Sequence, residues 1–221
     1  MNRLSRVYRK YRWYFLPTLR MKSIVWIDIL QELEKQFKRL SPGLVVDIGG
    51  REAPYKHMVP YKRYLILDID ESSQPDIVAN AEKIPIGSDL VDTVLCIETL
   101  EHVRYPNKVI DEIYRILKGG GVCILSTPFI HPYHPGPEDH YRFSKEALKE
   151  LFKTFGHIDV ISYGNRFQMF FQFLNIRNNQ NPFWAVITDI FAAILNPLNP
   201  IISKIKYKDN FPFGHVVYAI K

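Results

Sequence analysis

Cysteine is scarce in this sequence, with only Cys96 and Cys123 among 221 residues. Both lie inside apolar runs, VLCI and GVCIL, and neither has a second cysteine at the spacing of a metal-binding or redox pair. We therefore expect two small buried core residues. This argues against a disulfide framework and favours a reducing cytoplasm as the location of the protein.

Long uninterrupted apolar runs are also missing. The segment FWAVITDIFAAILNPLNPII (183–202) contains Asp189, Pro197 and Pro200 within the roughly 20 apolar residues that a transmembrane helix needs. Near the N-terminus, YFL is much shorter than the ~7–15 apolar residues of a signal peptide. The sequence predicts neither a membrane span nor a cleaved leader.

Acidic residues are absent from residues 1–22, where 7 of the 29 basic residues lie. The net charge of +6 is thus concentrated in one arm. Apolar and aromatic side chains recur there at helical spacing, at Leu4, Tyr8, Tyr11 and Phe15. A basic aromatic helix favours peripheral binding to an anionic membrane surface or, less strongly, to nucleic acid; a solvated or lid-forming arm fits the same pattern.

Strand-like and helix-like apolar patterns alternate along the rest of the chain. Helical steps of three and four residues cover 25–40, 106–121 and 144–156, with Ser144 as an N-cap and glycines 119–121 ending the second helix. This alternation predicts an α/β fold: a doubly wound, Rossmann-like, mostly parallel seven-stranded sheet with helices on both faces. The expected strands cover 44–48, 64–69, 75–79, 91–97, 121–126, 157–163 and 214–221.

The expected organisation has four segments. A basic aromatic arm and a leading helix (1–43) precede the core (44–163), and an aromatic insertion (164–213) separates the core from its last strand (214–221). The insertion is rich in phenylalanine and Asn-Pro breaks, and we expect it to form a helical cap over the ligand-binding site or a surface that dips into a bilayer. With the arm, it favours an apolar or lipid-linked ligand.

Polar residues follow the expected strands, where a doubly wound sheet binds its ligand. The first such stretch, VVDIGGREAPY (45–55), places Asp47 before two glycines. An ionised carboxylate there would oppose a dinucleotide phosphate, since two like charges ~4 Å apart cost about 4 kcal/mol at an effective dielectric of 20. It would instead attract a cationic amino-acid ligand. Arg51 stands where a nucleotide-binding loop usually has another glycine.

Three later stretches of the sequence narrow the choice of ligand and of protein family. They are AEKIPIGSDLVDTVLCIETLEHV (81–103), DEIYRILKGGGVCILSTPF (111–129) and HPYHPGPEDHYRFSKEALKELF (131–152). With DIGG, they resemble the class I S-adenosylmethionine-dependent methyltransferases, particularly the small-molecule branch with the LEHV and R-x-L-K-x-G-G motifs. The resemblance covers about residues 44–163 and resumes at the last strand. It implies S-adenosylmethionine as the cofactor and methyl transfer, at oxygen or nitrogen, to a small-molecule, glycan or lipid-linked acceptor.

The resemblance also implies residue roles. The methionine end of the cofactor would border Asp47, Gly49 and Gly50, the ribose would bind Asp68 or its neighbour Asp70, and the adenine would meet Asn80 and Ala81. Arg51 replaces the family's third glycine, and Asn80 stands where the family usually has an aspartate. Cys96 completes the expected set of cofactor-site residues.

Candidate bases lie after the fourth and fifth strands: Glu98, His131, His134 and His140, with Glu101, His102 and Asp139 as further titratable neighbours. The histidines are equally open to interpretation as structural loop residues, and Arg142 could position an anionic acceptor. The spacing of His131, His134, Asp139 and His140 matches no zinc pattern, so we expect no metal. A nucleic-acid methyltransferase and a non-catalytic cofactor-binding protein remain as alternatives.

Overall fold

The computed structural model describes residues 22–136, 138–166, 169 and 211–221. The basic arm and most of the expected cap fall outside these residues, so the expectations of a membrane-binding arm and a helical cap stay predictions. Within the described part of the chain, no helix is long and apolar enough to cross a membrane.

The chain divides into two compact units. One comprises Met1–Gln31 and Gly164–Phe213, of which few residues are described. The other comprises Glu32–Tyr163 and Gly214–Lys221, and it contains the whole sheet and every candidate site residue. The fold and the site below are those of this second unit, which we call the core unit.

Seven strands form one sheet in the order β3-β2-β1-β4-β5-β7-β6. Neighbouring strands are parallel except at β7, which pairs antiparallel with both β5 and β6. The sequence-based prediction of a doubly wound, mostly parallel, seven-stranded sheet is confirmed. The strands are β1 (Gly43–Ile48), β2 (Tyr61–Asp68), β3 (Ile77–Val78), β4 (Val91–Ile97), β5 (Leu117–Pro128), β6 (His157–Tyr163) and β7 (Gly214–Ile220).

Strand order reverses between β1 and β4, which are direct neighbours. From β1 the chain proceeds outward to β2 and β3, and from β4 it proceeds the opposite way to β5. The loops that follow the carboxyl ends of β1 and β4 therefore diverge from each other. Sheets of this kind bind their ligands between such loops. The sheet topology thus places the residues after β1, β2 and β4 on one edge.

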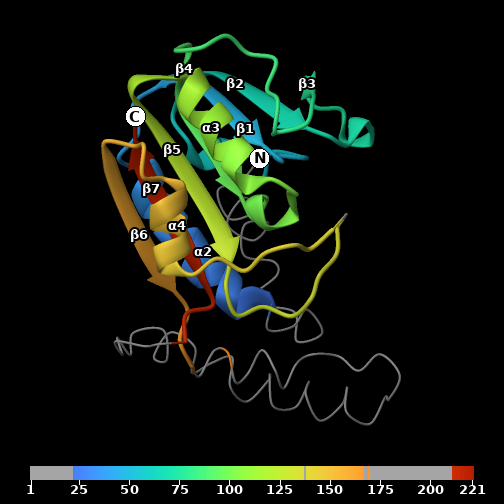
Figure 1. Cartoon of the computed structure of the whole chain (residues 1–221), viewed down its shortest axis with the longest axis vertical. Helices are drawn as coiled ribbons and strands as arrows, with labels where there is room; N and C mark the ends of the chain where they lie inside the picture. Colours follow the sequence, from blue (N-terminus) through green and yellow to red (C-terminus); the bar gives the residue numbers. More distant parts are fainter. Residues whose placement is uncertain (1–21, 137, 167–168, 170–210) are drawn as a thin grey trace, which may run out of the picture. The chain divides into compact units, whose positions relative to one another are not determined.

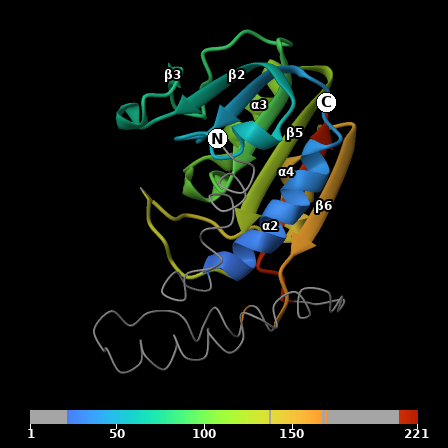
Figure 2. The same ribbon diagram turned by 180° about the vertical axis from the view of Figure 1, so that it is seen from behind.

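Helices cover both faces of this sheet. Figure 1 shows α3 (Pro106–Ile116) and α4 (Lys145–Leu151) in front of the strands, and Figure 2 shows the part of α2 (Lys22–Phe37) that belongs to the core unit, residues 32–37, on the opposite face. In the core-unit part of α2, the ring of Phe37 lies 6.4 Å from that of Tyr55. The helix α4 begins as predicted, because the Ser144 hydroxyl accepts a hydrogen bond from the Ala147 backbone N–H at 3.2 Å.

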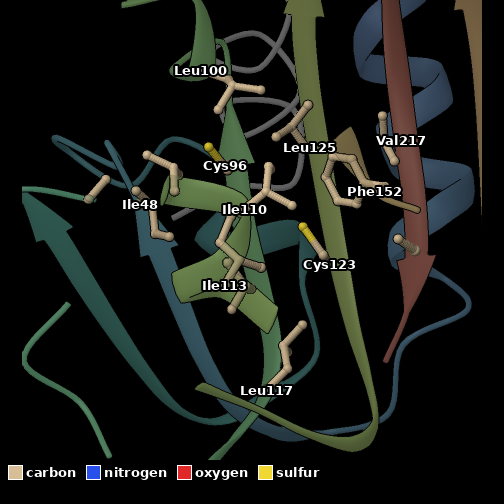
Figure 3. Close-up of a cluster of buried hydrophobic side chains, with 14 of the residues drawn as sticks. Ile48, Cys96, Leu100, Ile110, Ile113, Leu117, Cys123, Leu125, Phe152 and Val217 are labelled. Atoms are coloured by element: carbon tan, nitrogen blue, oxygen red, sulfur yellow. The ribbon is translucent and has the colours of Figure 1, made fainter. Parts of the chain in front are cut away.

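The hydrophobic core lies between α3, α4 and the sheet (Figure 3). The apolar stripe predicted for α3 is buried, since Val109, Ile110, Ile113 and Ile116 are each at most 1% exposed. Cys96 and Cys123 are fully buried free thiols in the same core, as their apolar context predicts. Fully burying each large aliphatic side chain stabilises the fold by about 1.5–3 kcal/mol.

Several element boundaries differ from the sequence-based expectation. The second helix ends at Ile116, not at glycines 119–121, because the chain from Leu117 onward pairs with β4 and Gly120 donates to the Lys221 carbonyl. The third strand shrinks to two residues; the Asp76 carboxylate accepts a hydrogen bond from the Ile66 backbone N–H just before them. The helices expected at 25–40 and 144–156 are α2, which ends at Phe37, and α4, which ends at Leu151.

Candidate active site

The turn after β1 is held against the turn after β4. Gly49 has a φ of 71°, in the left-handed region that favours glycine, and its N–H donates to the Leu67 carbonyl at 2.7 Å. A Cβ at this position would lie 2.7 Å from Thr99 Cγ2 and would overlap Thr99 Oγ1. The Thr99 hydroxyl is itself fixed by the carbonyls of Ile48 and Ile97. Only glycine fits this close approach.

Asp47 is a buried carboxylate at the end of β1. It is 1% exposed and accepts a hydrogen bond of 2.6 Å from the Tyr64 hydroxyl on β2. A Cβ on Gly50 would lie 2.6 Å from Asp47 Oδ2, so the second glycine gives this carboxylate its space. Burial raises the pKa of Asp47 to about 6, a rise that Tyr64 opposes and the charge of Asp68 increases. Asp47 therefore gains its charge just below neutral pH.

Asp68, at the end of β2, anchors the same turn. Its two oxygens accept hydrogen bonds from the backbone N–H groups of Arg51, at 3.3 Å, and Asp70, at 2.9 Å. Arg51 has a φ of 41°, the left-handed conformation that a glycine would adopt more easily. The arginine thus keeps the backbone shape of a glycine loop at some cost in strain. Asp70 is exposed and binds Ser72 instead.

The three remaining residues expected at the cofactor lie in different surroundings. The exposed Asn80 uses its amide oxygen to accept from the Glu82 backbone N–H at 2.8 Å, and Ala81 is buried. Cys96 is 0% exposed and packs in the hydrophobic core. Its thiol is a core group, and a contact between Cys96 and the cofactor stays a prediction.

Glu98 follows β4 with a φ of 50° and points its carboxylate at two hydroxyls. Glu98 Oε1 accepts from Ser126 Oγ at 2.8 Å and from Tyr163 Oη at 3.3 Å. Desolvation by burial raises the pKa of this carboxyl, and the two hydroxyl donors oppose that rise. Glu98 is therefore an acid whose proton is held more tightly than usual, beside the β1 turn.

The loop between β5 and α4 is organised by an ion pair. The Arg142 guanidinium binds both oxygens of Asp139, with the Nη2–Oδ2 distance at 2.7 Å, and the Asp139 side chain is 2% exposed. Asp139 also accepts from the His134 backbone N–H at 2.9 Å. These charge-assisted hydrogen bonds lower the pKa of Asp139 and fix the loop.

Two of the three expected histidines meet in this loop, and the third does not. The rings of His131 and His134 lie 4.4 Å apart, whereas His140 directs Nε2 to the Glu138 carboxylate at 2.8 Å. Desolvation lowers the pKa of both His131 and His134, so both are neutral at pH 7. His102, from the loop after β4, joins them, with its ring 5.1 Å from that of His134.

Several residues that shape the site were not singled out in the sequence. Tyr64, Ser126 and Tyr163 bind the two key carboxylates from three different strands, β2, β5 and β6. Each of these residues lies in a strand of mostly apolar residues, where a side chain with a hydroxyl group can also pack in the core. The composition of the strands therefore does not indicate a role at the site. The pairing of strands alone brings these hydroxyls to the carboxylates.

Residues 18–125 match the family model described as a methyltransferase domain. An uncharacterized methyltransferase of Mycolicibacterium vanbaalenii is 30% identical over 90 residues, covering 39% of this chain and 35% of that protein. A ubiquinone biosynthesis O-methyltransferase of Psychrobacter cryohalolentis is 50% identical over 36 residues, covering 16% of this chain and 14% of that protein. The chain spans less than half the length of these curated relatives.

Solved structures share the fold across nearly the whole chain. An S-adenosylmethionine-dependent methyltransferase of Thermotoga maritima, described as a possible histamine N-methyltransferase, aligns with a TM-score of 0.56 at 18% identity. The alignment covers 98% of this chain and 97% of that one. Residues 18–125 are thus similar to a methyltransferase domain, and the chain shares the fold of solved S-adenosylmethionine-dependent methyltransferases.

Proposed function

We propose that this protein transfers a methyl group from S-adenosylmethionine to an oxygen or nitrogen of a small-molecule, glycan or lipid-linked acceptor. One observation carries the proposal. Two buried carboxylates, Asp47 and Asp68, flank a glycine turn at the carboxyl ends of adjacent parallel strands, beside the point where strand order reverses.

The residues around this turn fit the cofactor. The negative charge of Asp47 attracts the ammonium group at the amino-acid end of the cofactor. The cofactor has no phosphate that this charge would repel. Each Asp68 oxygen accepts one backbone hydrogen bond, and a carboxylate has about four acceptor positions, which leaves capacity for two ribose hydroxyls. The bound cofactor supplies a methyl group already activated on a positively charged sulfur.

The chain itself must align the acceptor and remove its proton where it has one. Alignment alone can lower the barrier by about 7–11 kcal/mol in favourable systems. We assign proton acceptance to Glu98, His131 and His134, because the histidines are neutral at pH 7 and Glu98 adjoins the β1 turn through Thr99. His140 is the weakest candidate, since its Nε2 already faces Glu138.

Two observations support the small-molecule branch and methylation at oxygen. The LEHV and R-x-L-K-x-G-G motifs lie in the loop after β4 and at the α3–β5 junction. The short stretch shared with the ubiquinone biosynthesis O-methyltransferase points to an oxygen acceptor, although it covers only 16% of this chain.

Substituting Asp68→Ala should weaken binding of S-adenosylhomocysteine, the demethylated cofactor, by roughly 100-fold. The variant loses two hydrogen bonds to a charged acceptor, each worth about 1.5–3 kcal/mol. Isothermal titration calorimetry measures the affinity. Asp70→Ala is the matched control, because Asp70 is exposed and bonded to Ser72. Unchanged affinity in Asp68→Ala, or a larger loss in Asp70→Ala, would refute the ribose assignment; no binding by the wild type would refute the proposed function.

Cofactor affinity should also rise with pH, through a midpoint close to 6, where Asp47 becomes charged. Below that pH the neutral carboxyl no longer attracts the ammonium group. We expect a change of about tenfold between pH 5 and pH 7.5, measured as the dissociation constant of S-adenosylhomocysteine. Asp47→Asn should flatten the profile, and Glu98→Gln should leave its midpoint in place. A profile that stays steep in Asp47→Asn would assign the titration to another group.

A further inference from the structure

We infer that Glu101, His102 and His134 form a binding site for a divalent transition-metal ion of the zinc type. The three side chains come from two loops, after β4 and after β5, that are more than 30 residues apart in sequence. One ligand atom from each lies within 4.8 Å of the others. The spacing that argued against a metal was that of His131, His134, Asp139 and His140, and only His134 of these belongs to the present site. The fold therefore brings together three residues whose combination the sequence spacing does not indicate.

The carboxylate of Glu101 is the strongest evidence for a ligand. Glu101 is 0% exposed, and among the residues that the structure describes neither of its oxygens accepts a hydrogen bond from another residue. A buried carboxylate without hydrogen bonds is costly and uncommon in native proteins. An ion bound at this point would satisfy it.

Both histidines direct the same ring nitrogen toward that carboxylate. His102 Nε2 lies 3.7 Å and His134 Nε2 lies 3.8 Å from Glu101 Oε1. Ligand atoms around a tetrahedral zinc are about 3.3 Å apart, given zinc–nitrogen and zinc–oxygen bonds of about 2.0–2.2 Å. To bind one ion, each nitrogen has to approach Glu101 Oε1 by about 0.4 Å, and the two nitrogens, which lie within 4.8 Å of each other, have to reach the same spacing.

The opposite ring nitrogens have partners of the kind that orient metal ligands. His102 Nδ1 is hydrogen-bonded to the Glu138 backbone carbonyl. His134 Nδ1 faces Asp139 Oδ2 at 3.5 Å, and Arg142 Nη2 lies 3.4 Å from the same nitrogen. The carbonyl behind His102 fixes that ring with a proton on Nδ1 and leaves Nε2 free to donate its lone pair to a metal. At His134 the Arg142 hydrogen bond uses the lone pair of Nδ1, so metal binding there requires the proton to move from Nε2 to Nδ1, where Asp139 can accept it.

The ligand chemistry selects the kind of ion and its use. Two imidazoles and one carboxylate suit Zn²⁺ or Co²⁺ better than Mg²⁺ or Ca²⁺, which prefer oxygen ligands. Three protein ligands leave a coordination position open, as in catalytic zinc sites. That an acceptor oxygen occupies this position rests on the proposed function; the metal site itself does not. With the ion bound, His134 is a ligand and no longer a base, and Glu98 and His131 remain for proton acceptance.

The test is metal binding by the full-length protein, produced without a histidine tag and stripped with a chelator. Zinc is titrated against a chromophoric chelator, and Co²⁺ absorption in the visible range reports the coordination geometry. We expect about one ion per chain with a dissociation constant below about 1 μM. His102→Ala and His134→Ala should each weaken binding at least ~100-fold, and Glu101→Gln should weaken it too. His140→Ala, in the same loop but bound to Glu138, is the matched control and should bind like the wild type.

Two results would overturn the site: a wild type that binds neither Zn²⁺ nor Co²⁺ at 100 μM, or His102→Ala and His134→Ala variants that bind as well as His140→Ala. Circular dichroism identifies any variant that fails to fold, and a zinc-dependent rise in the melting temperature of the wild type gives a second readout. Titrating metal-free protein with S-adenosylhomocysteine separates the two proposals. Metal binding without cofactor binding would sink the proposed function alone, and the reverse result would sink the metal site alone.

Discussion

Substituting Gly49→Ala should reduce binding of S-adenosylhomocysteine below detection, a loss of at least ~100-fold. Two effects add at this position. The backbone has a φ of 71°, which costs a residue with a Cβ about 1–2 kcal/mol. The new methyl group would also overlap Thr99 Oγ1 and lie 2.7 Å from Thr99 Cγ2, so the turns after β1 and β4 must separate. That movement would displace Asp47 and the backbone that borders the cofactor.

Calorimetry on folded protein measures this loss. Gly119→Ala is the control, because a Cβ there meets nothing within 4 Å in the structure and the position lies at the start of β5, away from the carboxyl edge. A second variant, Gly49→Ala with Thr99→Gly, removes the overlapping side chain and should recover part of the affinity. Wild-type affinity in Gly49→Ala alone would show that the turn does not contact the cofactor.

Replacing Arg142 by methionine should lower the free energy of unfolding by about 3 kcal/mol. The guanidinium is 24% exposed and neutralises Asp139, whose side chain is 2% exposed. Removing one partner of a buried ion pair leaves an uncompensated charge, which typically costs 3–5 kcal/mol. The partial exposure of Arg142 places the expected loss at the lower end of that range. Because Asp139 also holds the His134 backbone, the loop around His131 and His134 should loosen in the same variant.

Urea denaturation at pH 7 measures the stability, and hydrogen exchange of residues 130–141 measures the loop. Arg104→Met is the control, because the exposed Arg104 side chain lies over the ring of Tyr105, and the substitution keeps the backbone carbonyl that accepts from Tyr141. In the double variant with Asp139→Leu the stranded charge is gone, and we expect part of the lost stability to return. A loss below 0.5 kcal/mol in Arg142→Met would mean that solvent screens the pair as it does on a surface.

The sequence alone determined the sheet, the helices and the edge at which the site lies. Apolar runs ending in polar residues predict buried parallel strands with functional groups at their carboxyl ends, because both patterns depend only on local spacing. Asp47, Gly49, Gly50, Asp68 and Glu98 all lie on that edge. The helix end predicted at glycines 119–121 was wrong because that prediction also depended only on local sequence. Pairing of Leu117 with β4 ends the helix earlier, at Ile116.

Only the tertiary structure decided which side chains meet. Arg51 stands where a nucleotide-binding loop usually has another glycine, yet its backbone takes the left-handed form and its N–H donates to Asp68. Glu101, His102 and His134 carry no common spacing, and they converge because the loops after β4 and β5 leave neighbouring strands on the same edge. Contacts between such distant segments depend on strand order and loop conformation, neither of which is written in local periodicity.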